Sequence, residues 1–302
     1  MLGLRADGYH ELRTVFQTVG LHDRLGIGVD PGSRRADVVL DCDLAGIGGP
    51  DNLAVRAARA VLEETGVRRR VRLQLRKQVP MGAGLGGGSS DAAAVLRNLP
   101  ALLGRRLAFA RRLEMAEALG ADVPYFLVGG LAVGLGRGSE VYPQADFRPR
   151  PVVIVYPGLH VSTADAYRRL DDARRPASPA GAGSPAAAPA PSLTSPAEAN
   201  KILGFCALLY EGQWDRLEND FEPVVFSASP ELARLKRFLL RAGASPALLC
   251  GSGSAMFAMY ETGAAARRAA ARARRQWPRW QVWVTRTVTR RQWLREALEA
   301  PE

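Results

Sequence analysis

The chain has 302 residues, of which 47% are hydrophobic and 24% are charged, a composition that excludes a disordered chain and fits a globular protein of two domains. Its formal net charge is +11, but only three of the 41 basic residues are lysines, and no basic patch with interleaved aromatic residues accompanies the charge. We therefore expect no nucleic-acid partner, whereas a small anionic ligand such as a nucleotide remains compatible with the charge.

The sequence predicts neither secretion nor a membrane span. The three cysteines are scattered and form no disulfide framework, as is typical of proteins in the reducing cytoplasm. The longest apolar run starts at Phe126 and reaches Arg137 too soon to cross a bilayer, and charged residues interrupt the N-terminus before a signal peptide could form. We expect a cytoplasmic protein with no membrane partner and with no metal held by a cluster of protein side chains.

The first quarter of the chain is predicted to contain strands followed by one helix. Short β-branched segments separated by turn residues predict strands over residues 14–21, 24–30 and 36–42. After Asp51, apolar residues between Leu53 and Leu62 fall on one helical face, and Gly66 is the expected stop signal of this helix.

The next segment alternates apolar and polar residues. Val71, Leu73 and Leu75 alternate with polar side chains, which predicts a strand over residues 71–79 with one face toward solvent. A glycine-rich loop follows. Beyond it the pattern predicts helices over residues 90–103 and 108–119, and then an apolar strand pair that ends at Val141.

A second domain is predicted from residue 149, so that the two domains span residues 1–148 and 149–302. Residues 174–196 are rich in alanine, proline and glycine, which predicts a disordered surface insertion. A strand is expected at 152–158, and helices resume from about residue 196. The tail resembles a β–α–β module, with strands at 246–250, 255–260 and 280–288 around a helix at 264–276.

The segment MGAGLGGGSSDAA, which begins at Met81, carries the strongest functional signal. Its spacing matches the dinucleotide fingerprint, but the strand before it alternates instead of being wholly apolar, and no acidic residue ends a strand about 20 residues later. A P-loop also fails, because no lysine followed by serine or threonine closes the motif. We expect the loop and the helix after it to hold a phosphate group, with the hydroxyls of Ser89 and Ser90 available to phosphate oxygens or Mg²⁺. A tight turn with serine caps is the structural alternative.

The segment PMGAGLGGGSSDAA, from Pro80, resembles the ATP-binding motif of the GHMP kinases, and within them is most similar to the 4-diphosphocytidyl-2-C-methyl-D-erythritol kinase family. Three further segments agree in order: RADGYHEL from Arg5, GADVPYFL from Gly120 and CGSGSAMFA from Cys250. The resemblance covers nearly the whole chain apart from residues 174–196. It implies an α+β fold with an N-terminal mixed α/β nucleotide-binding domain and a C-terminal ferredoxin-like α+β domain.

The resemblance implies ATP and Mg²⁺ as cofactors, and a cytidine diphosphate sugar alcohol as the small-molecule substrate of a monomer or homodimer. The substrate-binding residues that it implies are Tyr9, His10, Thr163, Tyr167, Gly251, Ser252 and Gly253. The ATP-binding residues that it implies are Asn52, Lys77, Pro80, Met81, Gly82, Ala83, Gly84, Leu85, Gly86, Gly87, Gly88, Ser89 and Ser90. Several have plainer explanations: Tyr167 as helical core packing, Lys77 as a strand-edge charge, and Gly251–Gly253 as a hairpin turn.

Asp122 matches the family's catalytic aspartate, which takes or orients the proton of the acceptor hydroxyl. Without the resemblance, an aspartate two residues before a proline is more often a turn or cap residue. The implied reaction transfers the γ-phosphoryl group of ATP to the 2-hydroxyl of 4-diphosphocytidyl-2-C-methyl-D-erythritol, in non-mevalonate isoprenoid precursor synthesis. Two alternatives stay open: another GHMP kinase of the homoserine or mevalonate type, and a non-catalytic nucleotide-binding protein.

The N-terminus departs from the pattern of the family. Its members begin with a strand like PAKLNLFL, whose lysine pairs with the catalytic aspartate, whereas this chain begins MLGLRADGYHEL. We expect the natural start to lie upstream, because the other motifs are intact and loss of a strand exposes a sheet edge. The nucleotide sequence before Met1 is then expected to encode an in-frame segment of this kind.

Overall fold

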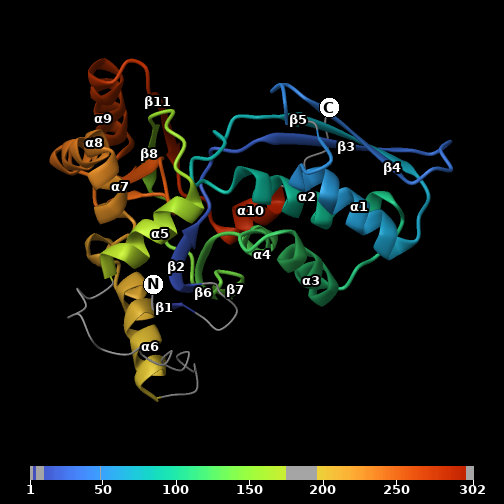
Figure 1. The fold of residues 1–302 in the computed structure, drawn as a ribbon, viewed down its shortest axis with the longest axis horizontal. Helices are drawn as coiled ribbons and strands as arrows, with labels where there is room; N and C mark the ends of the chain where they lie inside the picture. Colours follow the sequence, from blue (N-terminus) through green and yellow to red (C-terminus); the bar gives the residue numbers. More distant parts are fainter. Residues whose placement is uncertain (1–2, 5–9, 48, 175–195, 297–302) are drawn as a thin grey trace, which may run out of the picture. The chain divides into compact units, whose positions relative to one another are not determined.

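Figure 1 shows the computed structural model, which describes residues 3–4, 10–47, 49–174 and 196–296. The described residues form two compact units, each assembled from separate stretches of the chain. Unit 1 takes its residues from 1–11, 82–85 and 150–286, and unit 2 from 12–81, 86–149 and 287–302. The predicted boundary at residues 148 and 149 lies near the start of the longest stretch of unit 1 and stays a prediction.

Unit 1 contains a four-stranded antiparallel sheet in the order β11 (Gln281–Arg286), β8 (Pro151–Tyr156), β10 (Met256–Met259) and β9 (Ala247–Leu249). In chain order these strands are the fourth, first, third and second of the sheet, which is the ferredoxin-like arrangement. The helices of the unit are α5 (Thr163–Arg174), α6 (Pro196–Tyr210), α7 (Glu222–Ala228), α8 (Pro230–Arg241) and α9 (Gly263–Gln276), with a short 3-10 turn at Trp214–Arg216.

The core of unit 1 forms where α8 and α9 pack against this sheet. Leu232, Leu235 and Leu239 recur every three to four residues on α8 and are fully buried. The alanines of α9 have the same spacing, from Ala266 to Ala273, and their small side chains allow the helix to pack closely while its arginines face solvent. The predicted helix at 264–276 is confirmed.

Unit 2 contains a three-stranded sheet with β5 (Arg70–Arg76) between β3 (Arg24–Asp30) and β4 (Asp37–Cys42). β3 runs antiparallel to β5, and β4 runs parallel to it. The predicted alternation is confirmed: Val71, Leu73 and Leu75 are buried, and the polar residues between them are exposed. Val71 and Leu73 pack into one core with α1 (Leu53–Thr65) and α2 (Gly87–Leu102), which lie side by side in Figure 1.

A second sheet has the order β1 (Gly3–Leu4), β2 (His10–Gln17), β6 (Leu131–Gly136) and β7 (Glu140–Pro143). β2 carries the chain from unit 1 into unit 2 at residues 11 and 12. The remaining helices of unit 2 are α3 (Phe109–Leu119), α4 (Val123–Val128) and α10 (Arg290–Glu296). None of the described helices is long and apolar enough to cross a membrane.

The predicted elements differ from the structure at their boundaries. The strand expected at 14–21 lies at His10–Gln17, and the helix expected from Ser90 begins at Gly87. Helices α4, α5 and α10 were not predicted, because they are short or strongly polar. The predicted insertion at 174–196 lies outside the described residues except for Arg174 and Pro196 at its ends. The predicted α+β class and the ferredoxin-like C-terminal arrangement are confirmed.

Candidate functional site

The glycine-rich loop turns the chain from β5 into α2. Gly82, Gly84 and Gly86 have φ angles of 63°, 78° and 70°, which are left-handed values that other residues rarely adopt. Within the described part of the chain, the backbone N–H groups of Gly87, Gly88 and Ser89 donate no hydrogen bond. The start of α2 therefore presents three free donors and the positive end of the helix dipole, which together favour an anion.

The first half of this loop packs within unit 1 against the C-terminal glycine segment. The N–H of Ala255 donates to the carbonyl oxygen of Ala83 at 3.1 Å. A Cβ atom on Gly84 would lie 2.0 Å from the carbonyl oxygen of Cys250, so only glycine fits there. Two motifs far apart in the sequence thus meet backbone to backbone, as expected if both serve one site.

The C-terminal glycine segment is held by side chains from α5 and from the loop before α7. The hydroxyls of Thr163 and Ser252 are hydrogen bonded at 2.9 Å. Asn219 donates through its Nδ2 atom to the carbonyl oxygens of Leu249 at 2.9 Å and Gly251 at 2.8 Å. The structure brings the predicted Thr163, Gly251 and Ser252 together, next to Gly253. Asn219 was missed by the sequence analysis because no motif surrounds it.

Two of the predicted substrate-binding aromatic residues also meet in unit 1. The His10 ring stacks on the Tyr167 ring, with centroids 4.4 Å apart and planes 25° apart. The Nε2 atom of His10 lies 2.8 Å from Oδ1 of Asp171. Thr163, Tyr167 and Asp171 are spaced four residues apart on α5 and so share one helix face, a signal that the sequence analysis did not use. Tyr9 lies outside the described residues.

The stacked pair limits where a base could bind. Rings at this separation are in direct contact, so a cytosine cannot lie between His10 and Tyr167 in this arrangement. An edge-on contact from Phe221, with centroids 4.9 Å apart, further confines the ring of Tyr167. A base would therefore have to use an outer face of the pair or separate the two rings.

Asp122 lies immediately before α4, in unit 2. Its side chain forms no cap to the helix, and within the described ranges its carboxylate has no hydrogen-bond or ion-pair partner. The residue is exposed, yet the protein around it is dense enough to raise the pKa of its carboxyl above 3.8 through burial. A free carboxylate of raised basicity suits proton transfer.

Lys77 follows β5 and lies in a buried ion cluster of unit 2. Its ammonium contacts the carboxylate of Asp23 and lies 3.0 Å from Oδ2 of Asp91, and the three side chains are 4%, 2% and 6% exposed. Asp23 also accepts hydrogen bonds from the N–H groups of Gln78 at 2.6 Å and Val79 at 2.9 Å. The cluster therefore fixes the chain on both sides of the glycine-rich loop.

The cluster perturbs the ionisation of its members. Burial raises the pKa of Asp91 to about 6, against the lowering effect of Lys77. Burial alone would lower the pKa of Lys77, but the carboxylates of Asp91 and Asp23 hold it above 10.5. Both shifts are consistent with a charged Lys77 ammonium that lies between the carboxyl groups of Asp23 and Asp91 and is their shared counterion.

Two of the predicted ATP-binding residues, Lys77 and Asn52, have structural partners within the protein. The alternative reading of Lys77 as an exposed strand-edge charge is wrong, because its ammonium is buried. Asn52 caps α1: its Oδ1 accepts from the N–H of Ala54 at 2.9 Å, and its Nδ2 donates to the carbonyl oxygen of Ile47 at 3.1 Å. Contact of either residue with ATP stays a prediction.

Comparison with known proteins bears directly on this arrangement. Residues 52–130 match the family model described as GHMP kinases N terminal domain, and residues 194–279 match that described as GHMP kinases C terminal. A 4-diphosphocytidyl-2-C-methyl-D-erythritol kinase from Solibacter usitatus is 47% identical over 86% of this chain and 77% of its own length. That from Moorella thermoacetica is 36% identical over 95% of this chain and 94% of its own. The chain belongs to this family of GHMP kinases.

Solved structures agree with the family assignment. A crystal structure of 4-(cytidine 5'-diphospho)-2C-methyl-D-erythritol kinase matches this GHMP kinase with a TM-score of 0.72 and 35% identity, over 94% of this chain and 93% of that one. A homoserine kinase from Cytophaga hutchinsonii matches with a TM-score of 0.65 over 90% and 88% of the two chains, but at 19% identity. The second similarity shows the shared fold only.

Proposed function

We propose that this GHMP kinase transfers the γ-phosphoryl group of ATP to the 2-hydroxyl of 4-diphosphocytidyl-2-C-methyl-D-erythritol, in the non-mevalonate route to isoprenoid precursors. The observation that carries the proposal is the start of α2, where three free N–H groups follow a loop that only glycines can form. Its relatives at up to 47% identity carry the name of this kinase. Phosphoryl transfer depends mainly on positioning and charge stabilisation, for which such a cradle is suited.

The donor set fits a nucleotide with Mg²⁺. Mg²⁺ keeps several water ligands and takes the rest from phosphates and one or two protein oxygens. The half-buried Ser89 and Ser90 lie in the first turn of α2 and offer hydroxyl oxygens, whereas no cluster of three acidic, histidine or cysteine ligands exists among the described residues. We propose that Mg²⁺ arrives with ATP, where it would neutralise phosphate charge.

Asp122 is proposed to accept or orient the proton of the reacting hydroxyl. Its carboxylate is solvent-accessible and, within the described ranges, unpartnered, so no internal bond has to break before it acts. Burial raises the pKa of its carboxyl above 3.8, which makes the carboxylate a stronger proton acceptor than an ordinary aspartate.

The substrate's cytidine diphosphate is proposed to bind along the face of α5 that carries Thr163 and Tyr167, beside the segment from Gly251 to Gly253. The hydrogen bonds from Thr163 and Asn219 preset the conformation of that segment, which reduces the entropy lost when a ligand binds. His10 is proposed to contact the base through its ring. We further propose that the protein works in the cytoplasm as a monomer or homodimer.

The decisive experiment compares the Asp122→Asn variant with the wild-type protein. Both proteins carry the N-terminus that is produced in the cell. Formation of the phosphorylated product from ATP and the cytidine substrate is followed by ³¹P NMR, and ATP binding is measured by calorimetry. Turnover is expected to fall at least about 100-fold while ATP affinity stays within about twofold, because the aspartate acts on the acceptor and not on the nucleotide.

The matched control is Asp51→Asn, which removes an exposed carboxylate in the same unit that lies outside the predicted site. It should retain full activity. Undiminished turnover by Asp122→Asn would contradict its role. Phosphorylation of homoserine or mevalonate in place of the cytidine substrate would overturn the proposed function, and ATP binding without any transfer would favour a non-catalytic protein.

A further inference from the structure

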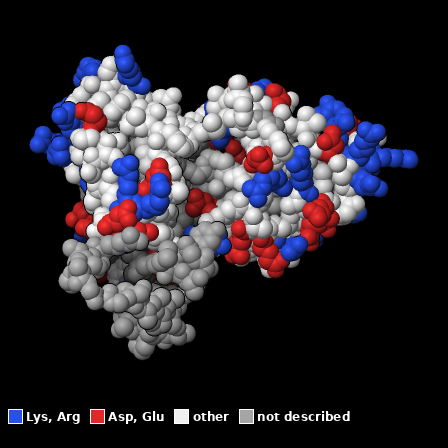
Figure 2. All heavy atoms as spheres, viewed as in Figure 1, with Lys and Arg blue, Asp and Glu red and all other residues white. Residues whose placement is uncertain are grey.

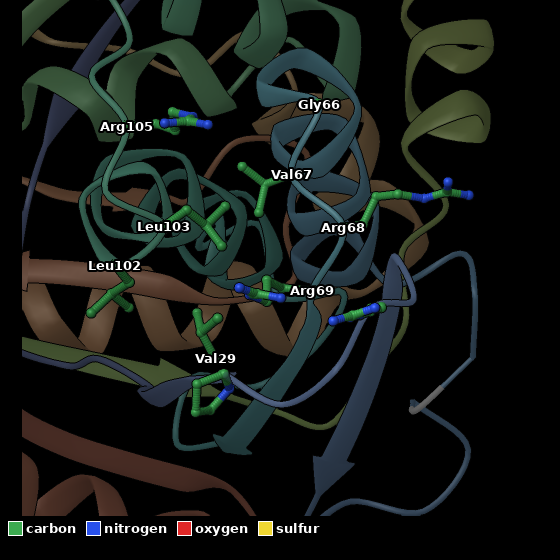
Figure 3. A pocket seen from close by; sticks show the side chains of 10 residues that line it. Val29, Gly66, Val67, Arg68, Arg69, Leu102, Leu103 and Arg105 are labelled. Carbon is green, nitrogen blue, oxygen red and sulfur yellow. The ribbon is translucent and has the colours of Figure 1, made fainter.

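An arginine-rich pocket lies in unit 2, and none of the residues of the predicted site lines it (Figure 3). Its volume is about 770 Å³, within the range of small-molecule sites. Four arginines and no acidic residue contribute to its lining, which comprises Val29, Pro31, Arg34, Gly66, Val67, Arg68, Arg69, Leu102, Leu103 and Arg105. In Figure 3, Arg69 and Arg105 lie around Val67 and Leu103, whereas Arg68 extends away from them.

The arginines of this pocket differ from their neighbours in lacking counterions. On the same sheet, Arg70 pairs with Asp37, and Arg72 pairs with Asp30. Glu64, near the end of α1, pairs with Arg111. These three carboxylates are thus paired with arginines that do not line the pocket. Within the described part of the chain, none of the four lining arginines forms an ion pair.

Local backbone groups do not neutralise this charge. Helices α1 and α2 both end at the pocket, and their C-terminal dipoles together offset about one unit of positive charge. Part of the negative charge at the end of α2 is already compensated by backbone hydrogen bonds. Arg105 and Gly104 donate their N–H groups to the carbonyl oxygens of Pro100 at 2.8 Å and Ala101 at 3.0 Å. The guanidinium of Arg69 donates to the carbonyl oxygen of Ser33 at 2.8 Å. A positive excess remains.

The remaining lining is apolar. Leu102 is 53% exposed, and Val29, Val67 and Leu103 add further apolar side chains to the lining. On the face shown in Figure 2, basic side chains gather over the end of unit 2 that carries β3, β4 and β5. An apolar surface rimmed by unpaired guanidinium groups suits an anion that also has an apolar part.

We propose that this pocket binds a small organic phosphate, with the phosphate on the arginines and the organic part on the leucines and valines. The pocket lies at the C-terminal end of α2, and the glycine-rich loop lies at its N-terminal end. The 16 residues of the helix separate the two by roughly 24 Å, so one small ligand cannot occupy both. The proposal stands independently of the proposed kinase reaction.

Phenyl phosphate is the probe, with inorganic phosphate as the comparison. Hydrogen exchange of the whole protein is followed by mass spectrometry as each probe is added, and affinity is measured by calorimetry. Phenyl phosphate is expected to slow exchange in the peptides that contain residues 66–69 and 102–105. It should bind at least about threefold more tightly than inorganic phosphate, because its ring buries apolar surface.

Two charge-matched variants test the assignment. Arg34→Gln/Arg69→Gln/Arg105→Gln removes three guanidinium groups of the pocket and should weaken phenyl phosphate binding at least about tenfold. Arg24→Gln/Arg56→Gln/Arg59→Gln removes three exposed arginines of the same unit outside the pocket and should leave binding unchanged. Thermal unfolding verifies that each variant folds. If the first does not, Arg105→Gln alone should still weaken binding measurably.

Three results would overturn the proposal. Protection confined to residues 82–90 would place the ligand at the glycine-rich loop instead. Equal weakening in both triple variants would indicate a general effect of net charge. Absence of any protection at residues 66–69 and 102–105 at millimolar phenyl phosphate would show that the arginines are only a solvated surface.

Discussion

At the scale of single residues, the glycines of the glycine-rich loop meet different structural requirements. Gly84 has a positive φ and lies against the backbone of Cys250. Gly88 has no positive φ, and a Cβ atom there would meet only Leu53 at an ordinary 3.7 Å. The sequence analysis assigned both to one phosphate-binding motif, but their structural requirements are separable.

The substitution Gly84→Ala is expected to destabilise the protein. The left-handed backbone alone costs an alanine about 1–2 kcal/mol, and the Cβ clash at 2.0 Å adds to this because backbone atoms cannot move aside cheaply. Gly88→Ala, in the first turn of α2, should leave the free energy of unfolding unchanged or raise it slightly. Chemical denaturation of the two variants checks the difference, and equal stability would show that the loop does not have the described conformation.

The pH dependence of turnover should report Asp122. Below its pKa the carboxyl is protonated and cannot accept a proton, so kcat/KM is expected to fall as the pH is lowered. Burial raises that pKa above 3.8, and the acidic midpoint should therefore lie above this value. Rates measured from about pH 4 to about pH 8, with circular dichroism at each pH to verify folding, test this expectation. A midpoint at or below 3.8 would contradict it.

The sequence predicted the residues of motifs better than their partners. The glycines and Asp122 could be found because a local pattern marks them. Asp23 and Asn219 could not, since each acquires its role only when distant segments meet: Asp23 with Lys77, and Asn219 with the C-terminal glycine segment. The helical spacing of Asp171 from Tyr167 was a usable signal, but its contact with His10 also depends on distant segments.

At the scale of elements, the buried cluster of Asp23, Lys77 and Asp91 connects the end of β5 to α2. Asp91 comes from α2, Lys77 from the turn after β5, and Asp23 from the turn before β3. A lysine between two carboxylates in an apolar setting stabilises little in itself, but removing one partner leaves the others uncompensated. The cluster therefore fixes the position of the end of β5 relative to the start of α2, and so both ends of the glycine-rich loop.

Lys77→Met should reduce the free energy of unfolding by about 3–5 kcal/mol, because two buried carboxylates lose their counterion. The matched control is Arg70→Met on β5, whose ion pair with Asp37 is about half exposed and contributes roughly 0–1 kcal/mol. Adding Asp23→Asn and Asp91→Asn to Lys77→Met should recover part of the loss. Equal effects of Lys77→Met and Arg70→Met, measured by urea unfolding, would contradict the buried arrangement.

Elements whose apolar residues recur with a clear period could be predicted from the sequence, whereas elements whose position depends on tertiary contacts could not. The stop at Gly66 places the end of α1 to the residue, and the alternation of β5 places its start within one residue, although the strand ends at Arg76 and not at residue 79 as predicted. α2 starts earlier than predicted because glycines are poor helix formers by propensity, whereas here Gly86 provides a left-handed cap. α10 escaped prediction because its sequence is mostly polar, and its place depends on Trp293 and Arg290.

At the scale of the whole molecule, the end of the chain belongs to unit 2 although most of the second half belongs to unit 1. The N–H of Val288 donates to the carbonyl oxygen of Thr18 at 2.9 Å. Arg290 donates to the carbonyl oxygen of Leu131 at 2.7 Å, and Trp293 donates to that of Phe126 at 3.2 Å. These bonds fasten α10 and the segment before it to three separate parts of unit 2.

Truncation after Arg286 is expected to destabilise unit 2 by about 3 kcal/mol or more, because it removes buried Thr287 and Val288 and exposes their partners. Truncation after Glu296 leaves α10 in place and should change stability little. Thermal unfolding of the two truncated proteins, compared with the whole chain, measures the effect. Identical melting temperatures for both would show that α10 and its bonds contribute no stability.

The discontinuity of the units has a consequence for synthesis on the ribosome. Unit 2 contains the earlier of the long stretches of the chain, yet it cannot complete its contacts until residues 287–296 have emerged. Unit 1, whose last stretch ends at Arg286, has all its residues available slightly sooner. The order of completion during translation is thus the reverse of the order in which the long stretches appear, and the nascent chain must hold an incomplete unit 2 for nearly the whole time of its synthesis.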